Sequence, residues 1–439
     1  MQKPFDITDR QRRLTLAALF VISVLNYIDR SIISILQVPI KTDLNLSDTQ
    51  LGLLTGLAFA ALYVSAAIPI SRLADRRSRK LVILGSMGFW SLMTAMSALA
   101  SSFVLLLLCR MGVAVGEAGS VPATHSQLAD LYPPERRARA IGRWALSLPF
   151  GLILGYLAAG RLADALGWRM TFAVIGAAGI VLLPLGLAVM KEPPRGRYDS
   201  SKPAETKLDF IASLGQLWRI RTYRYLVAAG SVHAFVQYSM MLWNGPFYSR
   251  VHGASLTEVS QYLALLNGIG GAVGIYGGSW LADRLGKHDQ KWLLLVPALA
   301  ILLMLPLGVI QYLVPSTRAS VIIGLLPSAL VFAYLAPIIA APMLVVGPHM
   351  RAFASAVMTV IFNLVGMGLG PLVTGAVSDL LITYGSMAEN SLRYALVVAL
   401  IPSLLASYLF WQASRHLQSD KDRSVAGSGP QSTRKHLHA

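Results

Sequence analysis

The sequence is poor in cysteine and in charge. Its one cysteine, Cys109, lies inside an apolar run, so a disulfide framework is excluded and no cysteine spacing could hold a metal. Charged residues make up only 13% of the 439 residues, against about 25% in soluble domains. Apolar windows of eighteen or more residues recur along most of the chain. These features exclude a soluble globular protein.

Signatures of enzymes and ATP-driven pumps are missing as well. The chain has no Gly-x-Ser-x-Gly elbow and no phosphate-binding Gly-Lys-Ser/Thr loop. His125, His233 and His349 lie on different apolar runs, without a partner at metal-ligand spacing. We therefore expect no enzyme activity, no metal and no cofactor, and a proton gradient as the energy source.

Acidic residues are scarce, 21 against 38 basic ones, which gives a formal net charge of +17. The basic side chains lie in short loops between apolar runs, with no aromatic-interleaved patch on a polar domain, so we expect no nucleic-acid partner. The polar N-terminus and the long first run, charged at its centre, do not fit a cleaved signal peptide. We expect this first run to stay in the membrane.

The apolar runs predict an all-α integral membrane protein with twelve transmembrane helices, since a helix crosses the hydrocarbon in about 20 residues. The N-terminus and alternate loops hold 30 Lys and Arg residues and the opposite loops hold six. This bias predicts a multi-pass protein of the inner (plasma) membrane with both termini in the cytoplasm. The expected spans are 14–38, 49–70, 81–101, 104–129, 141–162, 169–190, 224–249, 256–280, 292–313, 319–345, 353–378 and 392–413.

The chain also repeats itself. The sequence Leu-Ala-Asp-Arg at 73–76 recurs 208 positions later at 281–284. A glycine followed four residues later by an aspartate ends both the fifth and the eleventh span: Gly160 with Asp164, and Gly375 with Asp379. Six spans followed by six related spans indicate a parallel duplication, with the functional site between two pseudo-symmetric six-helix bundles.

This duplication divides the chain into an N-terminal bundle (1–190), a cytoplasmic linker (191–223), a C-terminal bundle (224–415) and a polar cytoplasmic tail (416–439). Apolar residues recur at helical spacing beside basic residues in the linker. They indicate either a short amphipathic helix on the inner membrane surface or a solvated linker. These residues are Phe210, Ile211, Leu214, Leu217 and Trp218.

Four charged residues lie where a membrane span should be apolar. Asp29 and Arg30 fall just past the middle of the first span, and Arg110 and Glu117 share one face of the fourth. A charge at the bilayer centre costs at least about 2.5–3.5 kcal/mol and is rarely kept without a partner or a task. Arg30 lies at a depth that lets it reach across to Glu117. The four residues predict a polar functional site; a static ion-pair network that only locks the helices is the alternative.

The loop that follows the second span, 71–80, resembles the signature motif of the major facilitator superfamily, with a second copy at 278–287. The second copy keeps both glycines of the motif, where the first copy has Ser71 and Ser78. The resemblance implies a cytoplasmic latch of the outward-open state. Charges that only set the topology are the alternative. The latch residues would be Asp75, Arg76 and Arg79, with Asp283 and Arg284 in the second copy.

Small residues four or five positions apart line the fifth and eleventh spans and allow helix backbones to approach closely. In a transporter they would form the seam on which the two halves rock, although static packing would give the same pattern. They are Gly151, Gly155 and Gly160 in the fifth span, and Gly366, Gly370 and Gly375 in the eleventh.

Three further segments resemble the spinster family of the major facilitators, and in particular its bacterial members. They are Asn26 to Arg30 in the first span, Arg110 to Ala118 in the fourth and Leu242 to Phe247 in the seventh. The resemblance covers nearly all of the chain except the last twenty-odd residues. It implies proton-linked or facilitated transport of amphipathic lipids, such as lysophospholipids or phosphorylated sphingoid bases.

We assign proton coupling to Asp29 and Glu117, because moving a cation to and from a buried carboxylate changes its affinity for a proton. Arg30 and Arg110 stay charged and could hold a phosphate or carboxylate head. Other polar residues in apolar spans are candidates for substrate binding, with interhelical hydrogen bonding as the alternative. These residues are Asn26, Tyr27, Ser120, Thr124, Gln237, Trp243, Asn244, Asn267 and Asn363.

The resulting hypothesis is an alternating-access, proton-coupled transporter of a lipid-like substrate. A symporter of small organic anions or sugar acids would use the same arginines, and an uncoupled facilitator, channel or lipid scramblase is a further alternative. The expected partners are a small amphipathic or anionic substrate and membrane lipids, and the expected state is a monomer.

Overall fold

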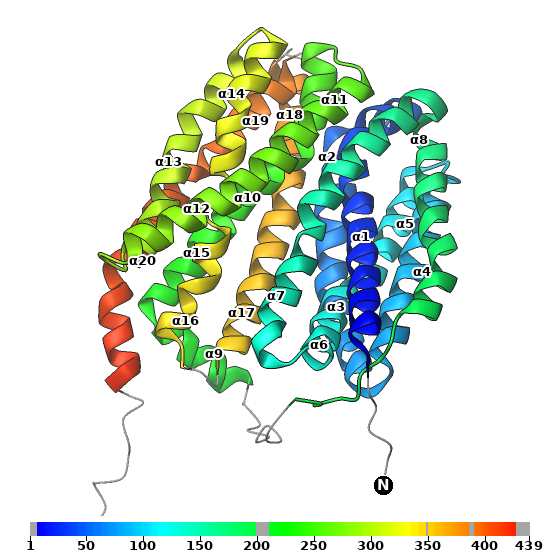
Figure 1. Ribbon diagram of the computed structural model, residues 1–439. Helices are drawn as coiled ribbons and strands as arrows, with labels where there is room; N and C mark the ends of the chain where they lie inside the picture. Colours follow the sequence, from blue (N-terminus) through cyan, green and yellow to red (C-terminus); the bar gives the residue numbers. More distant parts are fainter. Residues whose placement is uncertain (1–6, 199–209, 348–349, 386–389, 427–439) are drawn as a thin grey trace, which may run out of the picture.

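The computed structural model describes residues 7–198, 210–347, 350–385 and 390–426, and the regular structure in these ranges is helical (Figure 1). Two helical bundles stand side by side. The first runs from α1 (Asp9–Leu44) to α8 (Ser147–Val189), and the second runs from α10 (Arg221–His252) to α20 (Pro402–Ala426). The predicted fold class, a duplicated twelve-helix membrane protein, is confirmed.

Within the first bundle, several helices begin at polar residues whose side chains cap the helix N-terminus. Ser47 and Gln50 form a capping box at the start of α2, and Ser78 caps α4. Gly167 has φ +78°, a conformation that favours glycine, and there the chain reverses inside α8. The remaining helices of this bundle are α2 (Asp48–Gly52), the π-helical turn η1 (Leu53–Leu57), α3 (Ala58–Arg76), α4 (Arg79–Ser97), α5 (Phe103–Ala118), α6 (Ser120–Leu131) and α7 (Pro134–Ala145).

The second bundle repeats this plan. Ser255 and Glu258 form a capping box at the start of α11, at the position equivalent to Ser47 in the first half. The helices are α11 (Leu256–Leu263), η2 (Ala264–Gly270), α12 (Gly271–Gly286), α13 (Trp292–Leu313), α14 (Thr317–Leu330), α15 (Leu335–Ala340), α16 (Pro342–Val345), α17 (Arg351–Phe362), η4 (Asn363–Leu369), α18 (Gly370–Gly385) and α19 (Ser391–Leu400).

Nine helical segments of the described ranges are long and apolar enough to cross a membrane. One of them, Pro134–Val189, contains two crossings because the chain reverses at Gly167. The more polar α10 and the α11–α12 segment supply the other two of the twelve expected spans. Several helices extend beyond the predicted apolar limits and carry charged residues at their ends, as α1 does with Arg10 and Lys41.

Both described ends of the chain, the start of α1 and the end of α20, lie on one face of the molecule, here called the terminal face (Figure 1). The expected linker begins as a fixed segment: Lys191 N–H donates to Thr15 Oγ1, and Gly196 N–H donates to Asp130 Oδ1. Residues 199–209 lie outside the described ranges. The linker also contains the helix α9 (Phe210–Arg219), with Ile211 exposed and Leu217 buried; its position on the inner membrane surface stays a prediction.

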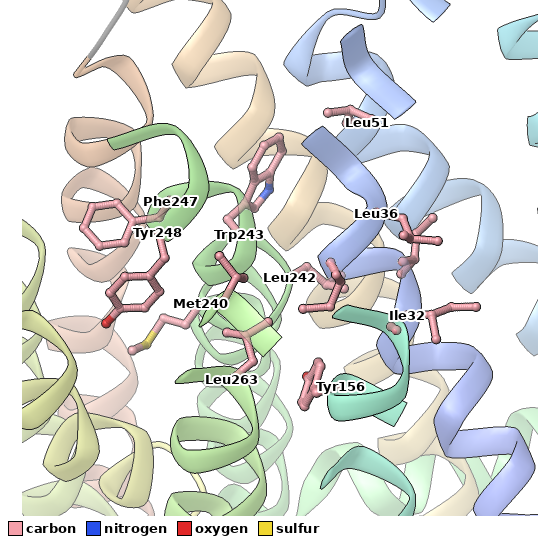
Figure 2. Close-up of a cluster of buried hydrophobic side chains, with 14 of the residues drawn as sticks. Ile32, Leu36, Leu51, Tyr156, Met240, Leu242, Trp243, Phe247, Tyr248 and Leu263 are labelled. Atoms are coloured by element: carbon pink, nitrogen blue, oxygen red, sulfur yellow. The ribbon is translucent and has the colours of Figure 1, made fainter. Parts of the chain in front are cut away.

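The face opposite the termini is closed by apolar side chains from both halves (Figure 2). Leu36 of α1, Leu51 of α2 and Tyr156 of α8 belong to one buried cluster with Trp243 of α10 and Leu263 of α11. Lipid tails are as apolar as these residues, so close van der Waals packing holds such a seam together.

The glycine pattern contributes to this seam only in part, which corrects the expectation that all six glycines lie between the halves. A Cβ at Gly160 would lie 2.4 Å from Ser260 Cβ of the second half, and one at Gly375 would lie 2.2 Å from the Asp48 carbonyl oxygen of the first. The other four pack within their own halves, Gly151 and Gly155 against α1, and Gly366 and Gly370 against α10. Successive glycines on one helix meet different neighbours because the helices cross at an angle.

Candidate functional site

A cavity of about 1240 Å³ lies between the two halves and reaches the terminal face. Arg30 of α1 and Arg110 of α5 line its inner part, and Asp75, near the end of α3, lines its mouth. Most other lining residues are aliphatic or aromatic. With the opposite face closed, this conformation is open toward the terminal face alone.

Arg30 and Glu117 form an ion pair between α1 and α5. Arg30 Nε donates to Glu117 Oε2 at 2.6 Å. The Glu117 side chain is fully buried, whereas 23% of the Arg30 side chain is exposed. The carboxylate therefore lies behind the arginine, which is the partner that a molecule in the cavity would meet.

Asp29 and Arg110 form a second, looser pair beside the first. Arg110 Nη1 lies 3.6 Å from Asp29 Oδ2, and Thr94 Oγ1 of α4 donates to Asp29 Oδ1 at 2.8 Å. Both side chains are almost fully buried. Asp29, like Glu117, is absent from the cavity lining, while Arg110 belongs to it. Each of the two ion pairs thus presents its arginine to the cavity and keeps its carboxylate behind the arginine.

Aromatic rings of α3 hold the two guanidinium groups. The Arg30 and Arg110 guanidinium carbons lie 5.7 and 5.6 Å from the Phe59 ring centroid, and Arg30 also lies 4.8 Å from Tyr63. Such cation–π contacts contribute about 0.5–2 kcal/mol each. Sequence reasoning missed both aromatic residues and Thr94. The four-residue spacing of Phe59 and Tyr63, on one face of the second span, was the signal that could have identified the aromatic pair.

Some predicted substrate-binding residues share this cavity and others do not. Besides the two arginines, Tyr27, Gln237 and Asn363 line it, and Gln237 Oε1 accepts from the Tyr334 hydroxyl at 2.8 Å. Asn26, Ser120 and Thr124 are buried in the first half outside the lining.

Three further predicted residues lie in helix contacts away from the lining of this conformation. Trp243 Nε1 donates to the Pro371 carbonyl at 3.0 Å, and Asn244 Oδ1 accepts from the Tyr312 hydroxyl at 2.8 Å. Asn267 Nδ2 donates to the Tyr156 hydroxyl at 3.1 Å and so joins the two halves.

In the described ranges, no ion pair or side-chain hydrogen bond joins the residues of the predicted latch to one another. Asp75 and Arg76 are exposed at the end of α3, and Asp283 and Arg284 are exposed at the equivalent position of α12, where Arg284 lies 5.2 Å from the Trp280 ring centroid. Arg79 is buried inside the first half, where it pairs with Asp130 and donates to the Pro193 carbonyl at 2.6 Å.

Glu192 completes the surroundings of Arg79 on the terminal face. Its carboxylate accepts from the backbone N–H of Arg79 at 2.7 Å, from the N–H of Lys80 at 3.2 Å and from the Ser78 hydroxyl. Burial alone would raise the pKa of Glu192, but these hydrogen bonds to its charged form hold the pKa below its ordinary value.

The closed face is fastened by a polar network around Asp48. Its buried carboxylate pairs with Lys41 of the first half and accepts from Arg250 Nη1 of the second at 2.9 Å. Ser378 Oγ of α18 donates to the same carboxylate at 2.6 Å. Charged groups buried in this way stay stable because each has several partners of opposite sign or hydrogen-bond donors.

Two aspartates cap helices of the opposite half on this face. Asp379 of α18 accepts from the N–H and hydroxyl of Thr49, at 2.7 and 2.6 Å, at the start of α2. Asp164 of α8 accepts from the N–H and hydroxyl of Thr257, at 2.8 and 2.5 Å, at the start of α11. Helix N-termini favour negative charge, so each aspartate fastens one half to the other.

Comparisons with known proteins agree with this architecture. Residues 19–371 match the sequence profile of the Major Facilitator Superfamily. The chain is 34% identical over 415 residues to an MFS-type efflux pump of Mycolicibacterium smegmatis, covering 94% of each. It is 27% identical over 454 residues to protein spinster homolog 1 of Homo sapiens, covering 97% of this chain and 84% of that protein.

The fold of this chain is also similar to that of a solved transporter structure. It is a bacterial homolog to the human lysosomal transporter Spinster, in an inward-facing and unoccupied conformation. The TM-score is 0.86 at 29% sequence identity, covering 94% of this chain and 99% of that one.

Proposed function

This chain belongs to the Major Facilitator Superfamily and, within it, to the spinster family, and we propose that it transports an amphipathic anion across the inner membrane in a proton-coupled cycle. Membership makes the chain a multi-pass transporter that works by alternating access. The Lys/Arg bias supports placing the terminal face in the cytoplasm, which makes the observed conformation inward-facing.

The observation that carries the substrate proposal is a pair of arginines set in an otherwise largely apolar cavity. Arg30 and Arg110 can hold a phosphate or carboxylate head, and the aliphatic and aromatic walls suit an acyl chain. At about 1240 Å³ the cavity exceeds the roughly 300–1,000 Å³ of ordinary small-molecule sites. The volume favours a lysophospholipid or sphingoid-phosphate type of substrate over a sugar acid.

The coupling proposal follows from the carboxylates behind these arginines. An anion that engages Arg30 competes with Glu117 for the same guanidinium group. A buried carboxylate that loses its cation is destabilised, and taking up a proton removes the uncompensated charge. Anion binding and protonation of Glu117 therefore favour each other, and the substrate should bind more tightly as the pH falls.

Ligand binding to the purified protein, measured by thermal shift, tests this function. An anionic lysophospholipid should raise the melting temperature, and more so at pH 6 than at pH 8. An uncharged monoacylglycerol and glucuronate should not raise it at the same concentration. A shift with glucuronate alone would support the small-anion alternative, and equal shifts with charged and uncharged amphiphiles would overturn the role of the arginines.

A charge-balanced double variant tests the arginine itself. Arg30→Gln combined with Glu117→Gln removes the ion pair without leaving an isolated buried charge, so the protein should stay folded and lose binding of the anionic ligand. Arg72→Gln is the matched control, because Arg72 lines the same cavity near its mouth and takes no part in the ion pairs of the site.

A further inference from the structure

A second cluster of arginines, separate from the central cavity, lies on α1 and α7 near the terminal face. These two helices are side by side in the first half (Figure 1). It surrounds a hollow of about 350 Å³. We propose that this arginine pocket binds the phosphate headgroup of an anionic phospholipid from the membrane leaflet on the terminal side. The arginines are Arg12, Arg13, Arg136, Arg139 and Arg143.

Among the residues that the structure describes, carboxylates do not balance the charge of the arginine pocket. Asp9 is the one carboxylate among the lining residues described, and it already pairs with Arg12 at 2.9 Å. In the described ranges no carboxylate pairs with Arg136, Arg139 or Arg143, which lie on one face of α7. Like charges three or four residues apart destabilise a helix, so a bound anion would relieve this repulsion.

A neighbouring arginine on the same helix shows the contrast. Arg137 is turned to the end of α6, where its Nη2 donates to the Ala129 carbonyl at 2.8 Å and so satisfies a helix terminus. The half-buried Tyr132 anchors the floor of the pocket by donating to the Arg12 carbonyl at 3.3 Å. One arginine of α7 therefore serves the fold, while the three that line the hollow remain available for a ligand.

The surface beyond the arginine pocket identifies the ligand as a lipid. Leu146, Phe150 and Leu154 follow Arg143 at intervals of four residues or less and are 52%, 53% and 49% exposed. They face away from the central cavity, whose lining takes Leu148 and Leu152 from the same stretch. Phe150 also contacts Phe20 of α1. A phosphate at the arginines would place acyl chains along this apolar stripe, which a soluble phosphate could not use.

The wild-type protein gives the first test, by native mass spectrometry after purification with equal amounts of phosphatidylglycerol and phosphatidylcholine. We expect phosphatidylglycerol to be retained preferentially, and 10 mM glycerol phosphate or inorganic phosphate not to displace it. Equal retention of the two lipids would overturn the proposal. Displacement by the soluble phosphates would also overturn it, in favour of a site for a soluble anion.

A pair of matched variants gives the second test. Neutralising Arg136, Arg139 and Arg143 to Gln should reduce retention of phosphatidylglycerol to the level of phosphatidylcholine. The control neutralises Arg219, Arg221 and Arg224, three exposed arginines near the terminal face of the second half, and should keep the preference. Equal losses in both variants would mean diffuse attraction to the membrane and would contradict a built site. Melting temperatures in phosphatidylcholine alone verify that both variants are folded.

Discussion

Asp379 at the end of the eleventh span accepts two hydrogen bonds from Thr49 at the start of the second, and so ties the two halves of the transporter together on the closed face. The internal duplication repeats this relationship, because Asp164 and Thr257 make the same contacts at the equivalent positions. Neither contact could persist if the halves parted on this face, so both stabilise the conformation that is open toward the terminal face.

Removing these two caps should therefore shift the conformational equilibrium toward the outward-open state. A lost helix cap costs about 0.5–2 kcal/mol, so Asp164→Ala with Asp379→Ala should change the equilibrium at least several-fold. Spin labels at Leu99 and Pro315, exposed on the closed face of the two halves, should report longer distances. The labelled protein would carry Cys109→Ser, which removes the buried native cysteine.

Asp43→Asn is the control for this experiment. Asp43 pairs with Arg169 at 2.5 Å on the same face but within the first half, so its loss should leave the distances unchanged. An unchanged distribution in the double alanine variant would show that the caps do not hold the conformation.

Glu117→Gln should separate a proton coupler from a static ion pair. The substitution keeps the shape of the side chain and fixes its charge at zero, so binding should survive without its pH dependence while gradient-driven transport into vesicles is lost. Because Arg30 is 23% exposed to the cavity, water can hydrate it, and the stability loss should be below the about 3–5 kcal/mol of a fully buried broken pair.

A static pair would behave differently in the same measurements. The melting temperature of Glu117→Gln would then fall strongly, binding and transport would fail together, and adding Arg30→Met would restore stability. That combination of results would refute the coupling role of Glu117.

Glu192 should make the stability of the protein depend on pH in the acid range. Hydrogen bonds in the folded state lower the pKa of its carboxyl below the ordinary 4.5, so their stabilisation is fully present above about pH 4.5 and is lost as the pH falls through the folded-state pKa. Glu192→Gln should lower the melting temperature at pH 7 and flatten its decline below pH 4.5. The exposed Glu135→Gln should do neither.

The orientation of the protein can be checked by labelling single cysteines in intact cells. A cysteine at Ala138, exposed on α7, should react only with a reagent that reaches the cytoplasm, and one at Leu99 should react with an impermeant reagent outside. Reaction of both from the same side would contradict the twelve-span topology.

The sequence by itself determined the helical architecture, the duplication and the position of the charged site. A membrane-spanning helix can be recognised from a single apolar run of the sequence. In lipid, every backbone N–H and C=O group needs a partner within the protein, and a helix supplies these partners within one segment. The charges at Asp29, Arg30, Arg110 and Glu117 stood out for the same reason, since an apolar span makes a buried charge conspicuous.

The tertiary structure alone decided how those charges are paired and which face of the protein is open. Neighbouring helix residues point about 100° apart, so Asp29 faces Arg110 and Thr94 while Arg30 faces Glu117 and the rings of α3. Such pairings depend on the rotation and depth of separate helices, which no local pattern encodes. The caps at Thr49 and Thr257 join residues that are 330 and 93 positions apart in the chain, so their contacts exist only once the two halves are packed together.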